Sequence, residues 1–235
     1  MKQRNKLCLL GLICFFLCGT VMGQNLLNPF NGISSKKMSY IHMQDGSEVK
    51  GNIKKLDRKK GLIEEVKIKT EDGNKKTLET EKISHMYLPQ SGLDKLGKAL
   101  DFMNDATQWN NDDYNQTLLG DGYALYEQSE VQIKKKKRTL VMQLLNPHFG
   151  NKIKIYHDPF ASETMAPSVG GVKIAGGDDK SYYISINGGT AYKLQKKNYK
   201  EEFKKLFGDN KEVMAKYGEA IRWKDFAEAV FEYSK

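Results

Sequence analysis

Two Asp-Gly pairs near the start of the chain constrain its fold more than any other feature. Asp45-Gly46 separates residues 40–43 from 49–56, and Asp72-Gly73 separates residues 62–70 from 76–80. In the flanking runs apolar and polar residues alternate, which is typical of strands with one buried face. Glycine accepts the positive φ that tight hairpin turns require. The sequence therefore predicts two β-hairpins, with residues 83–88 as a fifth strand.

Five short strands so close together predict a small β-barrel-like unit over residues 39–90. Gly51 would allow the sharp bend that closure of such a unit needs. The stretches "DGSEVKGNI" (45–53) and "VKIKTEDGNKKTLETEKISHMYL" (66–88) resemble the SH3-like and Sm-like small barrels. That resemblance covers about a fifth of the chain and implies a fold, without a function.

Residues 91–121 are predicted to form a linking helix and a polar loop. Ser91 and Asp94 have the spacing of a helix-capping box. Apolar residues then recur at helical spacing, namely Leu93, Leu96, Leu100 and Met103. We expect a helix over residues 92–106, followed by a domain junction.

Residues 122–235 are predicted to form a β-rich unit capped by C-terminal helices. Candidate strands lie at residues 123–133, 139–145, 152–156, 172–175, 181–186 and 191–195, and Asn187-Gly188 suits a hairpin turn. One helical stripe starts at Tyr199 and stops at Gly208, and another follows Trp223. The predicted fold class is therefore α+β, with two or three helices at the end of the chain.

The N-terminal residues 1–23 have the pattern of a secretory signal peptide. Three basic residues precede the apolar run 7–21, and small residues before Gln24 suit cleavage there. Retention as an uncleaved anchor is the alternative, although the run is short for a bilayer. Residues 24–38 are expected to be an irregular lead-in.

Cleavage would change the chemistry of the chain. The cysteines Cys8, Cys14 and Cys18 all lie in the predicted signal, so the mature chain would contain no thiol, disulfide or cysteine metal ligand. The formal charge would fall from +9 to +6, because residues 1–23 contain three basic residues and no acidic ones. A mean hydropathy of −0.62 with a single long apolar run excludes a polytopic membrane protein.

Several stretches resemble uncharacterised secreted or cell-envelope proteins of Bacteroidetes-type bacteria. They are "LDRKKGLIEEVKIK" (56–69), "MYLPQSGLDKL" (86–96), "KKKKRTLVMQLLNPHF" (134–149), "IYHDPFA" (155–161) and "YKLQKKNYKEEFKKLFGDN" (192–210). The resemblance implies export to the envelope, in a periplasmic, outer-membrane-associated or extracellular location. It brings no assigned activity and no functional residue.

The chain contains only four histidines, and two of them lie close enough in sequence to suggest a metal site. His148 and His157 lie nine residues apart, and Asp158 adjoins the second. These three are weak candidate ligands for zinc or copper, which would need a further ligand from elsewhere. The competing interpretation, which we prefer, is that both histidines lie in turns that bracket one strand. No cofactor is expected.

The densest run of charge comprises Lys134, Lys135, Lys136, Lys137 and Arg138. It could contact anionic lipid or an acidic polysaccharide. The alternative is a solvated turn or a charged strand edge that prevents aggregation. Nucleic acid is not an expected partner, because the protein is predicted to be exported and no aromatic residues interleave with these charges.

Together these features favour an exported, non-enzymatic binding or scaffolding protein of the cell envelope, whose partner would be another envelope protein or an anionic lipid or polysaccharide. One alternative is an envelope enzyme or transport factor with a site built from distant residues. Another is a surface protein that associates with anionic lipid or polysaccharide through residues 134–138. After cleavage, no integral membrane span is expected.

Overall fold

A computed structural model describes most of the chain after residue 25. The described residues are 26, 27, 29, 32–59, 61–91, 113–161, 168, 169, 172, 173, 179–218 and 220–235. The predicted signal peptide (1–23) and the predicted helix (92–106) lie outside them. Within these ranges, no helix is long and apolar enough to cross a membrane.

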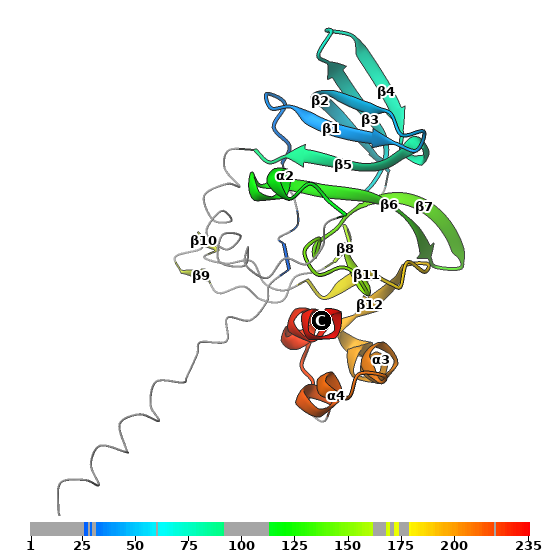
Figure 1. Cartoon of the computed structure of the whole chain (residues 1–235), viewed down its shortest axis with the longest axis vertical. Coiled ribbons are helices and arrows are strands. Elements are labelled where there is room, and N and C mark those ends of the chain that lie inside the picture. The colour runs from blue at the N-terminus through cyan, green and yellow to red at the C-terminus, as the bar shows by residue number, and fades with distance from the viewer. Residues whose placement is uncertain are drawn as a thin grey trace, which may run out of the picture.

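An antiparallel seven-stranded sheet forms the larger part of the fold (Figure 1). Its strands are β1 (Ser39–Met43), β2 (Glu48–Lys59), β3 (Leu62–Thr70), β4 (Lys75–Glu79), β5 (Ile83–Pro89), β6 (Tyr123–Ile133) and β7 (Lys136–Gln143). They follow the order β2-β1-β5-β6-β7-β3-β4, with an additional pairing between β2 and β3. The barrel-like unit predicted within residues 39–90 is not confirmed, because β5 pairs with β6 and the sheet continues into strands from beyond residue 112.

The hairpin turns arise where the Asp-Gly pairs predict them. Gly46 and Gly73 have φ values of 84° and 86°, in the left-handed region that glycine adopts without a steric penalty. Gly51 is needed for a different reason. It pairs with β1 on one side and β3 on the other, and a Cβ there would lie 2.2 Å from the Lys69 carbonyl oxygen. The close approach of another backbone therefore requires glycine.

A three-stranded antiparallel sheet lies beside the large one, in the order β12-β11-β8. Its strands are β8 (Ile153–His157), β11 (Ser181–Ile186) and β12 (Tyr192–Gln195), while β9 (Ser168–Val169) and β10 (Val172–Lys173) pair with each other. The helices are α2 (Gln116–Gly120), α3 (Tyr199–Phe207), α4 (Lys211–Tyr217) and α5 (Phe226–Ser234), and short 3₁₀ turns span Thr80–Lys82, Lys196–Asn198 and Trp223–Asp225. The predicted α+β class with C-terminal helices is confirmed.

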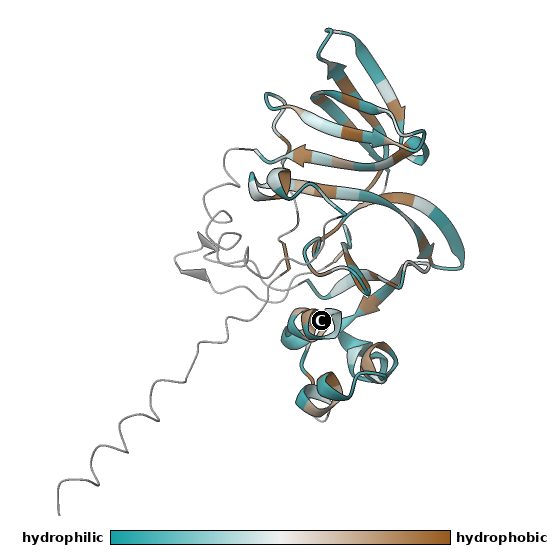
Figure 2. Cartoon of the chain, viewed as in Figure 1, coloured by the Kyte–Doolittle hydropathy of each residue, from teal (hydrophilic) through white to brown (hydrophobic). Residues whose placement is uncertain are grey.

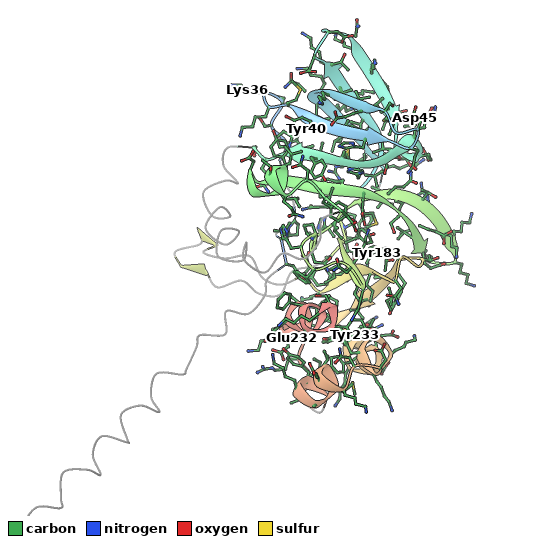
Figure 3. The ribbon with its side chains drawn as sticks, viewed as in Figure 1. Lys36, Tyr40, Asp45, Tyr183, Glu232 and Tyr233 are labelled. Atoms are coloured by element: carbon green, nitrogen blue, oxygen red, sulfur yellow. The ribbon has the colours of Figure 1, made fainter. Side chains whose placement is uncertain are left out.

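Hydrophobic and hydrophilic residues alternate along the strands of the large sheet, which Figure 2 shows as brown and teal segments. Successive side chains point to opposite faces, so the core is divided into layers. On β6, Ala124 and Tyr126 pack inside the large sheet, whereas Leu125 packs on its other face against Tyr156 and Tyr183. Figure 3 places Tyr183 between the large sheet and the helices.

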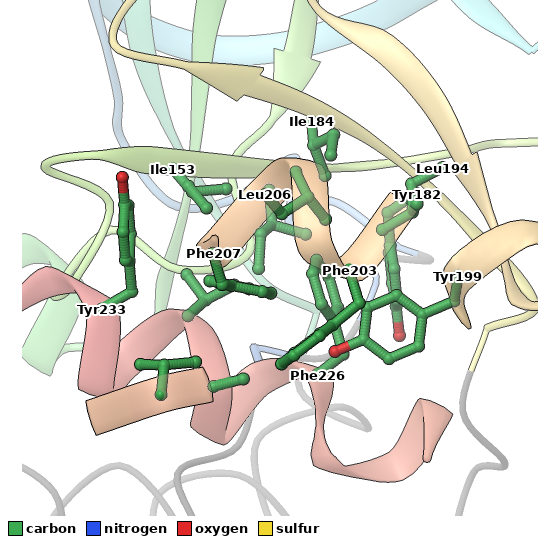
Figure 4. Packing of buried hydrophobic residues seen from close by; sticks show 14 of the residues in the cluster. Ile153, Tyr182, Ile184, Leu194, Tyr199, Phe203, Leu206, Phe207, Phe226 and Tyr233 are labelled. Atoms are coloured by element: carbon green, nitrogen blue, oxygen red, sulfur yellow. The ribbon is translucent and has the colours of Figure 1, made fainter. Parts of the chain in front are cut away.

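The opposite face of the small sheet supports the C-terminal helices. Ile155 and Ile184 pack there with Phe203, Phe207 and Phe226 from α3 and α5 (Figure 4). The small sheet is thus covered on both faces, which fixes its position between the helices and β6.

Candidate functional site

The basic run predicted from the sequence forms the tip of the β6–β7 hairpin. The strands pair up to Ile133 and Lys136, which leaves Lys134 and Lys135 as a two-residue turn. Strand β7 begins at Lys136, three residues earlier than the sequence predicts. Figure 1 shows this hairpin arching away from the rest of the large sheet. The three lysines at its tip are exposed.

The five basic residues of the run differ in their surroundings. The Lys137 ammonium donates to Glu130 Oε1 at 2.9 Å and to Thr190 Oγ1 at 2.9 Å. Arg138 Nη2 lies 3.6 Å from Glu64 Oε1. Lys134, Lys135 and Lys136 form no ion pair with any residue in the described ranges. The uncompensated charge is therefore concentrated at the tip.

Contacts with the small sheet hold the stem of this hairpin. The Gln132 amide donates to the Ala191 carbonyl oxygen at 2.7 Å, and the Ala191 amide donates to the Glu130 carbonyl oxygen at 2.7 Å. The Thr190 hydroxyl also donates to the Glu130 carboxylate. Within the hairpin, Gln132 Nε2 donates to the Lys134 carbonyl oxygen at 2.7 Å. The tip therefore projects from an anchored stem.

The structure does not bring His148, His157 and Asp158 together as a ligand set. His148 lies in the buried turn before β8, and burial lowers its pKa to about 4. His157 ends β8, and its pKa is lowered by burial, against the opposing charge of Asp158. No group of three or more His, Cys, Asp or Glu side chains that could hold a metal occurs in the described part of the chain.

Asp158 instead ties β8 to its neighbours. Its carboxylate is fully buried, and Oδ2 accepts a hydrogen bond from Ser181 Oγ at 2.6 Å. The same oxygen forms an ion pair with Lys193 Nζ at 2.5 Å. Oδ1 accepts from the Phe160 amide at 3.1 Å. These donors join the end of β8 to β11 and β12, which is a structural role.

A buried polar cluster that the sequence did not predict lies between the two sheets and is centred on Glu127 of β6. Tyr156 donates to Glu127 Oε1 at 2.5 Å, and Tyr114 donates to Oε2 at 2.5 Å. Lys154 Nζ lies 2.9 Å from Oε2 and donates to the Tyr114 hydroxyl at 2.8 Å. Burial and the Glu127 charge raise the pKa of both tyrosines, so they remain protonated and donate. We name these four residues the Glu127 cluster.

A pair of stacked histidines adjoins the Glu127 cluster. His85 lies opposite Glu127 in the β5–β6 register, and its ring stacks on His42 with centroids 4.3 Å apart. Tyr87 meets both rings edge-on. Burial and the neighbouring His42 lower the pKa of His85, which favours the neutral ring. His42 Nε2 lies 3.5 Å from Glu48 Oε1.

The chemistry open to the Glu127 cluster follows from these contacts. Both carboxylate oxygens already accept internal hydrogen bonds, and the Lys154 ammonium forms an ion pair with one of them. Such a carboxylate joins three parts of the chain, namely β6, β8 and the segment before α2, rather than acting as a free base. The local sequence shows only an acidic residue at position 127 directly after the apolar residues 124–126, which does not indicate its partners.

Comparisons with protein-family models, with curated protein sequences and with solved structures gave no match.

Proposed function

We propose that the protein is exported to the cell envelope and binds or scaffolds another envelope component without catalysing a reaction. The basic, then apolar, then small-residue pattern of residues 1–23 supports export. Export would place the described residues in the periplasm, on the outer membrane or outside the cell.

The hairpin tip is the observation that carries the binding role. Two of the buried carboxylates in the described core, Glu127 and Asp158, are used in internal contacts that join parts of the fold. The exposed lysines at residues 134–136, in contrast, are presented to solvent on an anchored projection. A surface of this kind suits contact with a partner, whereas the internal clusters suit stability of the fold.

We further propose that the large sheet closes in a barrel-like manner. Strand β2 is the first in the order and β3 is the last but one, so their additional pairing brings the two sides of the sheet together. Strand β3 also pairs with β7, at Ile63 and Val141. Apolar side chains on the inward face, including Ile41, Ile68 and Met86, are fully or almost fully buried. This arrangement supports the resemblance to small barrels, although strands from beyond residue 112 take part in it.

The test is crosslinking in cells that express the tagged full-length chain, followed by fractionation and mass spectrometry. We expect the protein in the envelope fraction, with Gln24 as its first residue, crosslinked reproducibly to one envelope component. A protein that stays in the cytosol with residues 1–23 attached would contradict export. A protein with no crosslinked partner that purifies with a bound small molecule would contradict the binding role.

A further inference from the structure

The turn at the hairpin tip contains a lysine at a position whose backbone conformation favours glycine or asparagine. Lys134 has a φ of 55°, in the left-handed region. The other described positive-φ positions are glycines or an asparagine: Gly46, Gly61, Gly73, Gly122, Asn187 and Gly188. Asparagine tolerates this conformation because its short polar side chain forms local hydrogen bonds, which a lysine side chain does not provide. A residue kept in a costly conformation is a reason to look for function at its position.

The charge at this tip also differs from that of a comparable hairpin. The β3–β4 hairpin exposes Lys69, Lys75 and Lys76, but two acidic residues, Glu71 and Asp72, lie in its turn. The β6–β7 tip contains no acidic residue, and the nearby Glu130 is already paired with Lys137. Its three lysines therefore create a positive potential that no adjacent carboxylate offsets.

The residue types at the tip indicate the chemistry of the partner. Lysine is a compact charge on a flexible stem, which suits mobile phosphate headgroups, whereas arginine suits fixed, fork-shaped recognition. The hairpin's arginine, Arg138, faces Glu64. Residues 132–138 include no aromatic ring that could stack on a sugar. These features favour a lipid surface over a polysaccharide.

We propose that Lys134, Lys135 and Lys136 form the site at which this protein contacts a membrane surface containing anionic phospholipid. The inference rests on the proposed export, which brings the tip to a membrane of the envelope. The anchored stem holds the three lysines at one projecting point, so all three can approach the same surface. The contact is electrostatic, and it is therefore weakened by salt.

The test uses the full-length chain expressed in cells and purified from their envelope. Its sedimentation is measured with vesicles of phosphatidylglycerol and phosphatidylcholine, and with vesicles of phosphatidylcholine alone, at low and high salt. The test variant is the triple substitution Lys134→Gln, Lys135→Gln and Lys136→Gln. The matched control is Lys69→Gln, Lys75→Gln and Lys76→Gln, which removes the same charge from the β3–β4 hairpin.

We expect salt-sensitive binding to the phosphatidylglycerol vesicles. Each lysine near an anionic surface contributes about fivefold in affinity, so the test variant should bind on the order of 100-fold more weakly. The control variant should bind nearly as well as the unmodified protein. Circular dichroism should show both variants folded, because all six lysines are exposed.

Four results would overturn the proposal. They are equal binding to phosphatidylcholine vesicles, equal losses in the two triple variants, displacement from vesicles by inorganic phosphate at millimolar concentration, and tighter binding to a soluble acidic polysaccharide than to vesicles. An envelope-located protein with any of these behaviours would refute the lipid contact and leave the proposed function standing. A cytosolic location would refute the proposed function itself.

Discussion

The Glu127 cluster predicts a large loss of stability when its carboxylate is removed. In the Glu127→Ala variant, Lys154, Tyr114 and Tyr156 would lose their shared acceptor. Removing one partner of a buried ion pair costs about 3 to 5 kcal/mol. The Glu127 side chain is 9% exposed and that of Lys154 is 31% exposed, so water can partly solvate the remaining ammonium. We therefore expect a loss near the lower limit, about 3 kcal/mol.

Urea unfolding followed by circular dichroism would measure this loss, and the melting temperature should fall by about 10 °C for a chain of this size. The matched control is Glu64→Ala, which removes the carboxylate of a surface pair with Arg138 at 3.6 Å and should cost less than about 1 kcal/mol. In a double-mutant cycle, Glu127→Ala and Lys154→Met should show a coupling free energy of about 1 to 3 kcal/mol. A loss from Glu127→Ala no larger than that from Glu64→Ala would refute the role of the cluster in joining the sheets.

Three further predictions concern single positions. Burial lowers the pKa of His148 to about 4, so the unfolded state binds a proton at higher pH than the folded state does. The free energy of unfolding should thus fall by about 2 kcal/mol as the pH drops from about 8 to about 5. Urea titrations at the two pH values should show that the His148→Gln variant no longer has this decrease. Lys134→Gly should raise the free energy of unfolding by about 1 kcal/mol in the same assay, since glycine removes the left-handed strain; a decrease would show that the turn favours lysine. Gly51→Ala should lower it by about 2 kcal/mol, because its Cβ would meet the Lys69 carbonyl oxygen, and an unchanged value would mean that β3 moves away freely.

Local patterning explains which strands could be predicted from the sequence. Strands β3, β6 and β11 have the predicted bounds. The apolar pattern of β3 and β11 ends at turns that contain Asp-Gly and Asn-Gly, and that of β6 ends at the lysine run. The predicted start of β7 is three residues too late, because the lysine run has the composition of a solvated loop although its backbone already pairs with β6 from Lys136. Helix α4 was not distinguished from its neighbours, because it is short.

Long-range pairing could not be predicted in the same way. Nothing local indicates that β5 pairs with β6 across residues 92–112, so the sequence suggested a barrel-like unit ending at residue 90. The Glu127 cluster could not be predicted for the same reason, because its donors lie 13, 27 and 29 residues from the carboxylate in the sequence. The basic run is evident from the local sequence. Which of its residues form ion pairs could not be predicted, because only the fold brings Glu130 near Lys137 and Glu64 near Arg138.

We propose that the chain is exported and that its three tip lysines hold it at a membrane of the envelope. Both parts of this proposal can be measured by fractionating cells before and after a high-salt wash, for the unmodified chain and the two triple lysine variants. We expect the unmodified chain and the variant at Lys69, Lys75 and Lys76 to sediment with envelope membranes until salt releases them. The variant at Lys134, Lys135 and Lys136 should be in the soluble part of the envelope without the wash. If all three proteins remained in the cytosol, export would be refuted, and if all three stayed on the membranes regardless of salt and substitution, the electrostatic contact would be refuted.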